Sequence, residues 1–312
     1  MSSAGQSAAG RIAGSAGGSG GAGSCAGGFH RGPGADQGEG AHGAPDADSP
    51  PAPVPGCVAA VIVHHATPDL LRRCLEALAA HAAGWLGSTV VVDNASPGSA
   101  LVPLAAAFPQ VRFVRAERNL GFAAGANLGW RAQPAPFHLL LNPDAWLLPG
   151  ALDAMLACMT AAPQAAVVAP RLENPDGTLQ YSCRRFPTLA AVLLRGLRLD
   201  GLWPQPVDRY LMRDWDHGQR RPVDWAIGAC LLLRQQAVQA VGGFDESFFL
   251  YYEDADLCRR LQQAGWQVWY EPGARVRHLH RRASATLWPG RPARAHARSL
   301  VRLFRKHSFP LW

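Results

Sequence analysis

The amino-acid sequence predicts an α/β fold with a mostly parallel sheet that is flanked by helices. Residues 57–63 and 88–92 are continuous apolar runs, which are typical of strands buried on both faces. Between them, apolar side chains recur every three or four residues after Thr67 and Pro68, which suit the N-cap and the first position of a helix. A strand, a helix and a second strand in this order form a βαβ unit, in which the two strands are parallel.

The next elements follow from the same periodicities. We expect a third strand over residues 111–114, and residues 118–129 have the pattern of a Gly-rich loop that runs into a helix. Three leucines, residues 139–141, predict a buried strand that ends at Asn142. Pro143 ends it because proline has no N–H for a sheet ladder and disfavours helix at the residue before it.

The middle of the chain predicts shorter elements. We expect a helix over residues 152–159, a strand over 166–169 and a hairpin turn over 174–177. Residues 184–221 are rich in Arg, Pro and Trp and are expected to be irregular. A buried strand is then expected to resume over residues 224–233.

The C-terminal part predicts a helix that begins at Glu253 and ends at Gly265, followed by strands over residues 266–270 and 276–280. From residue 275 to 306 there are ten Lys or Arg and no acid. This stretch contains a predicted basic amphipathic helix. Its apolar stripe is Ala297, Leu300, Val301 and Phe304.

The first 56 residues form a compositionally separate tail. Half of them are Gly or Ala and few are large and apolar, so the tail is expected to be disordered. It lacks the apolar central run of a secretory signal. No apolar run anywhere in the chain reaches about 18 residues, so no transmembrane helix is expected.

The body of the chain, residues 57–312, is basic. It carries 28 Lys or Arg against 19 Asp or Glu, because the tail holds only two and four of the 30 and 23 in the whole chain. A basic body suits an anionic substrate, an anionic membrane surface or nucleic acid. Seven Cys without a C-x-x-C pair favour a reducing compartment over a disulfide framework or a zinc ribbon.

Asp144 lies at the carboxyl end of the strand predicted over residues 139–141, where open α/β sheets bind their ligands. A carboxylate there can bind a hard divalent cation that in turn holds phosphates. Asn, Pro and Asp are also common turn formers. From these residues alone, a metal site and a simple turn are equally supported.

Several polar motifs follow the predicted strands in a fixed order. They are His64-His65, Asp93-Asn94-Ala95-Ser96, residues 119–127, Asn142-Pro143-Asp144, residues 243–246, residues 252–258 and His278. Together they resemble the family 2 glycosyltransferases, in particular the rhamnosyltransferase-like branch that builds bacterial cell-surface polysaccharides. The resemblance covers residues 57–307 and favours the metal site at Asp144.

The resemblance implies a GT-A fold, which is a Rossmann-like nucleotide-binding sheet that uses Mg²⁺ or Mn²⁺. We expect a GT-A domain over residues 57–290 and a basic C-terminal helix over residues 291–312. Within the domain, residues 57–150 would form the nucleotide-binding half and residues 151–290 the acceptor half.

The resemblance also implies which residues bind the donor. Asp93 would accept a hydrogen bond from N3–H of uracil or thymine, although an Asp there can also simply cap the following turn. The family usually carries Asn-Tyr-Asn where this chain has His64-His65-Ala66, so His65 would stack on the base over a smaller area than Tyr. The other expected donor-binding residues are Asn94, Asn119, Gly121, Asn127 and Asn142.

The remaining implied roles concern the reaction. Asp144 would hold the metal, and His278 would be a second ligand or a phosphate contact. Asp254 is the expected general base, because a helix N-terminus favours an ionised carboxylate, although acids are common at any helix start. Glu253 would orient Asp254 or bind the acceptor. The expected acceptor-site aromatics, which can equally be core residues, are Trp225, Tyr251 and Tyr252.

The expected activity is transfer of a sugar, rhamnose by resemblance, with inversion at the anomeric carbon. The donor would be deoxythymidine-diphosphate rhamnose or a UDP-sugar, and the acceptor a glycan or a lipid-linked glycan. We expect a cytoplasmic protein whose basic C-terminal helix docks on the anionic inner face of the cell membrane.

Three alternatives stay open at this point. A sugar-nucleotide pyrophosphorylase would carry a Gly-rich basic signature where His64-His65-Ala66-Thr67 stands. A nucleic-acid-binding protein would use the basic charge but would leave the acidic motifs unexplained. A catalytically inactive relative is suggested by the departure at His64-His65-Ala66.

Overall fold

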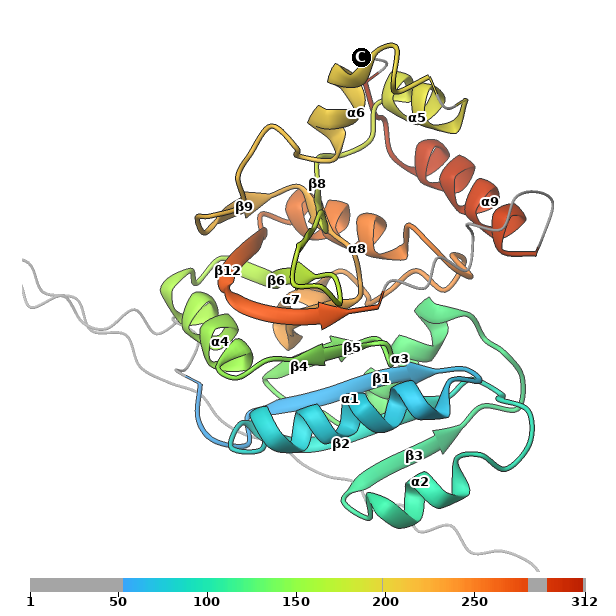
Figure 1. Ribbon diagram of the computed structural model, residues 1–312, viewed down its shortest axis with the longest axis vertical. Helices are drawn as coiled ribbons and strands as arrows, with labels where there is room; N and C mark the ends of the chain where they lie inside the picture. The colour runs from blue at the N-terminus through green and yellow to red at the C-terminus, as the bar shows by residue number, and fades with distance from the viewer. Residues whose placement is uncertain (1–52, 198, 280–290, 311–312) are drawn as a thin grey trace, which may run out of the picture. The chain divides into compact units, whose positions relative to one another are not determined.

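A ten-stranded mixed β-sheet organises the part of the chain that the computed structural model describes, residues 53–197, 199–279 and 291–310 (Figure 1). Its strands run in the order β3 (Val111–Arg115), β2 (Leu86–Asp93), β1 (Val58–His64), β4 (Phe137–Leu141), β11 (Cys230–Arg234), β6 (Ala165–Glu173), β12 (Gln267–His278) and β5 (Ala145–Leu147). Off this path, β7 (Leu179–Gln180) pairs with β6 and β9 (Arg221–Val223) with β12. Except for residues 53–56, the tail expected to be disordered lies outside the described residues.

The predicted α/β fold with a mostly parallel sheet is confirmed. Strands β3, β2, β1 and β4 are all parallel, and β11 enters the sheet antiparallel between β4 and β6. Ile62 and Val61 of β1 belong to two different hydrophobic cores, as expected for a strand buried on both faces. His64 lies opposite Asp93 in the register, so the two strands end at the same edge.

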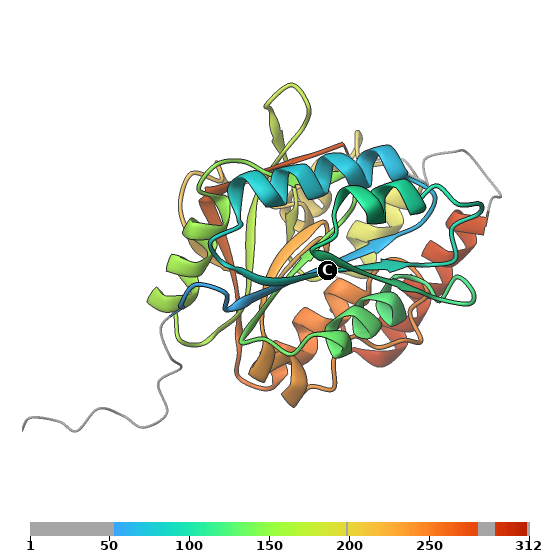
Figure 2. The ribbon, with the colours of Figure 1, turned by 90° about the horizontal axis from the view of Figure 1, so that it is seen from below.

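Helices cover both faces of the sheet (Figure 2). On one face pack α1 (Pro68–His81), α2 (Val102–Ala107) and α4 (Ala151–Ala161). On the other pack α3 (Phe122–Ala132), α7 (Gln235–Ala240) and α8 (Glu253–Gln263). Pro68 begins α1 as predicted, but the Thr67 side chain makes no capping hydrogen bond. Gly265 follows α8 with a φ of 86°, the left-handed conformation that ends many helices.

Two strand predictions need correction. The single strand expected over residues 224–233 is divided into β10 (Trp225–Ala226) and β11 by a turn at Gly228 and Ala229. The division arises because β10 pairs with β8 (Cys183–Arg184) in a separate small sheet, whereas β11 joins the main sheet. Conversely, the two strands expected over residues 266–270 and 276–280 are one strand, β12, with an irregular register between Glu271 and Arg275. Residue 280 lies outside the described residues.

The expectation that residues 184–221 lack regular structure is wrong. They contain α5 (Leu189–Gly196) and α6 (Pro204–Tyr210). Thr188 caps α5, because its Oγ1 accepts a hydrogen bond from the Ala191 N–H at 3.1 Å. Among the described residues, no helix has both the length and the apolar character that crossing a membrane requires.

The C-terminal helix α9 (Arg291–Lys306) is present, but the side of the helix that is buried differs from the predicted apolar stripe. Ser299 and Leu303 form its buried side, whereas much of the predicted stripe remains in contact with solvent. The rotation of the helix is set at its end by Asp256, a fully buried carboxylate of α8 that needs partners. Lys306 Nζ and His307 Nε2 lie 2.7 Å and 2.9 Å from Asp256 Oδ1.

Candidate active site

A small cavity lies at the carboxyl ends of β1 and β2, and Asp93 forms part of its wall. The cavity has a volume of about 150 Å³, and its lining also includes His64, Ser96 and Arg115. Asp93 Oδ1 accepts the Ser96 N–H at 3.0 Å. Asp93 Oδ2 lies 3.3 Å from Arg115 Nη1, yet among the described residues it has no hydrogen-bond partner. This buried oxygen can accept an N–H from a flat polar ring in the cavity.

His64, rather than His65, lines this cavity. The His64 Nε2 accepts the Thr67 N–H at 3.0 Å, so its Nδ1 carries the proton and faces Ser96 Oγ at 3.3 Å. Burial lowers the pKa of His64, which keeps the ring neutral. His65 is exposed, and its Nδ1 lies 2.9 Å from Asn94 O. His64 and Ser96 stand within the predicted motifs, but no role could be predicted for either, because their hydrogen bond joins separate strand ends.

Asn94 and Asn119 shape the Gly-rich loop before α3. The Asn94 amide donates to Asn119 Oδ1 and to Gly121 O, and its Oδ1 accepts the Leu120 N–H at 2.7 Å. Gly121 has a φ of 84°, and a Cβ there would collide with the carbonyl oxygen of Phe249. The structure therefore gives Asn94 the role of holding this loop in place.

Asn127 also makes its hydrogen bonds within the protein. Its Nδ2 donates to Phe244 O at 2.8 Å and to Glu246 Oε1 at 2.9 Å, and its Oδ1 accepts the Phe244 N–H. These bonds tie α3 to the loop over residues 243–246. Asn127 therefore positions that loop, and its expected contact with the donor remains a prediction.

Asp144 and His278 are brought together by the sheet register. β12 pairs antiparallel with β5, which places His278 opposite Ala145 and next to Asp144. His278 Nε2 lies 3.4 Å from Asp144 Oδ1. The Asp144 backbone also accepts the Leu279 N–H at 3.0 Å. The two residues lie in distant motifs that the resemblance assigns to one metal site, and the pairing of β5 with β12 brings them together.

The donor atoms at this position fit a divalent cation. Gln180 Nε2 donates to Asn174 Oδ1, which turns Gln180 Oε1 toward His278 Nδ1 at 2.6 Å. Nδ1 then carries the proton, and the lone pair of Nε2 is directed toward Asp144, the arrangement common around metal-binding histidines. Ligands at about 2.1 Å from one cation can lie up to about 4 Å apart, which accommodates the observed pair. Within the described residues no group of three or more His, Cys, Asp or Glu could hold a metal by itself.

Glu253 and Asp254 are buried at the start of α8. Asp254 Oδ2 accepts the Gly228 N–H and Oδ1 the Ala255 N–H, both at 2.8 Å. Burial outweighs these hydrogen bonds and the helix N-terminus and raises the pKa of Asp254 to about 6, although the carboxyl group is still mostly ionised at pH 7. Burial, followed by the charge of Asp254, raises the pKa of Glu253 well above its usual range.

The turn at Gly228 and Ala229 connects the two acidic sites. The Gly228 N–H holds Asp254, and the next residue, Ala229, accepts the Asn142 N–H at 2.9 Å. Asn142 in turn accepts the Ala145 N–H at 3.1 Å, which closes the turn that carries Asp144. The candidate base and the candidate metal ligand are therefore held by two consecutive residues. No local sequence pattern indicated Gly228, because its role depends on a contact with α8.

The expected acceptor-site aromatics lie just before α8 and in β10. Tyr251 and Tyr252 both have positive φ, at 69° and 66°, an uncommon conformation that clusters at functional sites. Trp225 is buried with its ring 6.5 Å from that of Tyr252, and its Nε1 donates to Arg185 O. His296 of α9 packs on both tyrosine rings at 5.2 Å and 5.1 Å.

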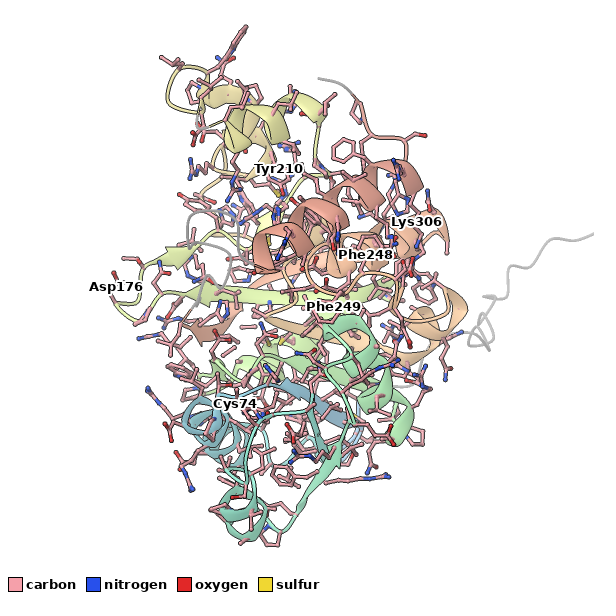
Figure 3. The ribbon with its side chains drawn as sticks, turned by 90° about the vertical axis from the view of Figure 1, so that its right-hand side faces the viewer. Cys74, Asp176, Tyr210, Phe248, Phe249 and Lys306 are labelled. Atoms are coloured by element: carbon pink, nitrogen blue, oxygen red, sulfur yellow. The ribbon has the colours of Figure 1, made fainter. Side chains whose placement is uncertain are left out.

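The two phenylalanines before the tyrosines point to different neighbours (Figure 3). Phe248 is buried beside Lys306 of α9, whose Nζ lies 5.8 Å from its ring centre. Phe249 is half exposed at the start of α3, where its carbonyl accepts the Phe122 N–H at 2.8 Å. Phe249 is therefore the one of the two with ring surface available to a ligand.

Comparison with known proteins agrees with this geometry. A family model described as "Glycosyltransferase like family 2" matches residues 55–294. The N-acetylglucosaminyl-diphospho-decaprenol L-rhamnosyltransferase of Mycobacterium tuberculosis is 34% identical over 221 residues, which are 67% of this chain and 70% of that protein.

Two solved structures share the fold. GalNAc-T7, crystallised with UDP, GalNAc and Mn²⁺, has a TM-score of 0.56 at 15% identity over 74% of this chain, which covers 45% of that structure. The mannosyltransferase PcManGT from Pyrobaculum calidifontis, in complex with GDP-Man and Mn²⁺, has a TM-score of 0.54 at 17% identity, with 84% and 68% of the two chains covered. The extent of the family match shows that this chain belongs to glycosyltransferase family 2 and is a glycosyltransferase enzyme.

Proposed function

We propose that the chain transfers rhamnose from a nucleoside-diphosphate donor to a hydroxyl group of a lipid-linked glycan, with inversion at the anomeric carbon. The observation that carries this proposal is the turn at Gly228 and Ala229, which holds the Asp254 carboxylate beside the turn of Asn142 and Asp144. The 34% identical relative is named as an L-rhamnosyltransferase for a diphospho-decaprenol acceptor, which supports the choice of sugar and acceptor.

Donor binding begins in the cavity at Asp93. Asp93 Oδ2 accepts the N3–H of a uracil or thymine ring, since Oδ1 is already engaged by the Ser96 N–H. A cytosine ring has no N3–H, so the same oxygen selects against it. The sugar diphosphate then extends toward Asp144 and His278. A divalent cation held there would supply positive charge to the leaving diphosphate.

Asp254 acts as the general base in this proposal. With a pKa of about 6 it is mostly ionised at pH 7, yet it holds a proton better than an exposed Asp does. It takes the proton of the acceptor hydroxyl while that oxygen bonds to the anomeric carbon. The bond from this carbon to the diphosphate oxygen breaks on the opposite face of the sugar, which inverts the configuration.

The decisive experiment replaces Asp254 by Asn and follows transfer from a labelled nucleotide sugar. We expect kcat to fall about 10²- to 10⁴-fold, because a positioned base contributes about that factor. Donor affinity, measured by calorimetry, should be retained. The matched control is Asp69→Asn, an exposed acid in the first turn of α1. Near-normal turnover in Asp254→Asn would remove the base assignment, and no transfer by the unaltered chain would favour the catalytically inactive relative.

The place of action is part of the same proposal. Arg294, Arg298 and Arg305 of α9 are exposed, and they suit the anionic inner face of the cell membrane, where a lipid-linked acceptor is found. The chain would then work in the cytoplasm as a peripheral membrane enzyme. The family match argues against the pyrophosphorylase and nucleic-acid-binding alternatives.

A further inference from the structure

Helix α5 and the residues after it expose an unusual number of large apolar side chains. Leu193 is 52% exposed, Leu197 66%, Leu202 85% and Trp203 58%, and Leu189 and Leu199 are also exposed. These six are among only eleven such side chains in the described residues, and they fall within fifteen consecutive positions. The other five are scattered over separate parts of the chain. Single exposed apolar side chains are ordinary, but a contiguous group marks an interaction surface.

The exposure of these side chains does not result from poor packing of α5. The opposite side of α5 is covered, because Ala190 and Ala191 are buried and Leu194 packs against the core. Leu189, Leu193 and Leu197 recur every four residues, so they share the outward side of the helix. Both sides of α5 are therefore apolar, which explains why the sequence showed no amphipathic contrast there.

Helix α9 supplies positive charge next to this surface. Leu189 at the start of α5 donates its N–H to Pro310 O, just after the end of α9, at 3.3 Å. At the other end of α5, Arg195 is near enough to His296 to help lower the pKa of His296, after the larger effect of burial. The start of α5 thus contacts the segment after α9, and its end lies near His296 of α9, and Figure 1 shows the two helices as neighbours.

The cations around the apolar surface face solvent. Arg195 and Arg209 are exposed on α5 and α6, and Arg294, Arg298 and Arg305 are exposed on α9. Leucines, a tryptophan and a border of arginines match the interface of an anionic bilayer, where apolar side chains enter the acyl region and arginines meet the headgroups. A protein partner for this surface would need its own acidic border.

We propose that α5, Leu197 and residues 199–203 insert into the surface of an anionic membrane, with α9 lying against the headgroups. This proposal differs from docking by α9 alone, because the apolar side chains carry the binding and the arginines give the preference for anionic lipid. It does not depend on the identity of the donor sugar, since vesicle binding is measured without any reaction.

The test compares sedimentation of three variants with phosphatidylglycerol-containing and pure phosphatidylcholine vesicles. The apolar variant combines Leu197→Ser, Leu202→Ser and Trp203→Ser, which are exposed positions where substitution leaves the fold intact. The charge variant combines Arg294→Ala, Arg298→Ala and Arg305→Ala. The control is Val102→Ser, a 67% exposed apolar position on α2.

We expect the apolar variant to lose at least 100-fold in partitioning, in both low and high salt, because inserted apolar side chains are not screened. The charge variant should bind phosphatidylglycerol vesicles less well than the unaltered chain in low salt, and the difference should disappear in high salt. Val102→Ser should bind like the unaltered chain. Transfer to a water-soluble acceptor should be unchanged in the apolar variant, which separates this proposal from the proposed function.

Two results would overturn the proposal. One is unchanged vesicle binding by the apolar variant. The other is a self-associated unaltered chain that becomes monomeric with the apolar substitutions and binds no vesicles, as judged by analytical ultracentrifugation. The second result would assign the surface to contact between two copies of the chain.

Discussion

Glu253 is a buried carboxylic acid beside a second one, Asp254. Its Oε2 has no hydrogen-bond partner among the described residues, and burial and the neighbouring charge both raise its pKa. Ionising both acids in this environment opposes folding, because neither charge has a basic partner in hydrogen-bond contact within the described residues. A buried pair of acids of this kind is common where function competes with stability.

Replacement of Glu253 by Gln should therefore stabilise the folded chain at neutral pH. A carboxyl group with a raised folded-state pKa contributes stability below its unfolded pKa of about 4.3, and this stability is lost as pH rises through the folded pKa. The two proteins should have similar stability near pH 4 and diverge above it. For each unit by which the folded-state pKa of Glu253 exceeds its unfolded pKa, the substitution should raise the free energy of unfolding by about 1.4 kcal/mol. For a chain of this size this corresponds to about 2 °C in melting temperature.

The measurement is thermal unfolding followed by circular dichroism as a function of pH. Glu76→Gln, at an exposed position on α1, is the control and should leave the pH profile unchanged. If Glu253→Gln instead destabilises the chain across the whole range, Glu253 is ionised and paired in the folded state.

At the scale of single elements, the start of α3 depends on a glycine. Gly121 adopts a φ of 84°, accepts the Asn94 amide and lies against the backbone of Phe249. Gly98 also has a positive φ, of 74°, but open space surrounds the position of its Cβ. The two glycines therefore separate the effect of backbone strain from that of a collision.

We expect Gly98→Ala to destabilise the chain by about 1 kcal/mol through strain alone. Gly121→Ala should be worse, by about 3 kcal/mol or more in total, because the new methyl group must displace the backbone of Phe249. Urea unfolding of both variants measures the difference. Equal effects for the two would mean that the loop before α3 moves away freely.

Which elements the sequence predicts depends on how local their causes are. β1, β2 and β4 can be predicted from runs of apolar residues, and α1 and α8 from the periodicity of their apolar residues. In each case the residues that are buried together are close in the sequence. The division at Gly228 is invisible, since the apolar run continues while the hydrogen-bonding partner changes from β8 to β4 and β6. α5 is missed for the opposite reason, as both of its sides are apolar.

The candidate site shows the same limit. Asp93, Asp144 and Asp254 could be selected because each is an acid that follows a strand or begins a helix. The contacts that give them their properties, the Ser96 N–H and the Gly228 N–H, depend on tertiary pairing that no local pattern encodes. For this reason the raised pKa of Asp254 could not be predicted from the sequence, although the residue itself could be selected.

At the scale of the whole molecule, β12, the last strand along the chain, reaches the turn that follows the central strand β4. β12 pairs with β6 from Gln267 to Arg277 and with β5 over its last three residues, and the pairing with β5 brings His278 to Asp144. The proposed donor site therefore draws on both halves of the chain, with Asp93 in one and His278 in the other.

Nucleotide binding should consequently raise the melting temperature in two separable parts. A nucleoside diphosphate with Mn²⁺ at about 100 times the dissociation constant stabilises the chain by about 2.7 kcal/mol. In Asp144→Ala, and in the unaltered chain after chelation, we expect the metal-dependent part to disappear and a smaller shift from base binding at Asp93 to remain. Asp69→Ala serves as the control, and a full shift in Asp144→Ala would place the metal elsewhere.

The late position of β12 also has a consequence for synthesis on the ribosome. Asp93, Asn142 and Asp144 leave the ribosome early, but β11 and β12, which complete the sheet around them, are made last. At about 5–20 residues per second, the nascent chain spends several seconds with the edge of β4 uncovered. A chain released before β11 would keep its first four parallel strands and expose the apolar edge of β4, which makes such truncated products targets for chaperones and proteases.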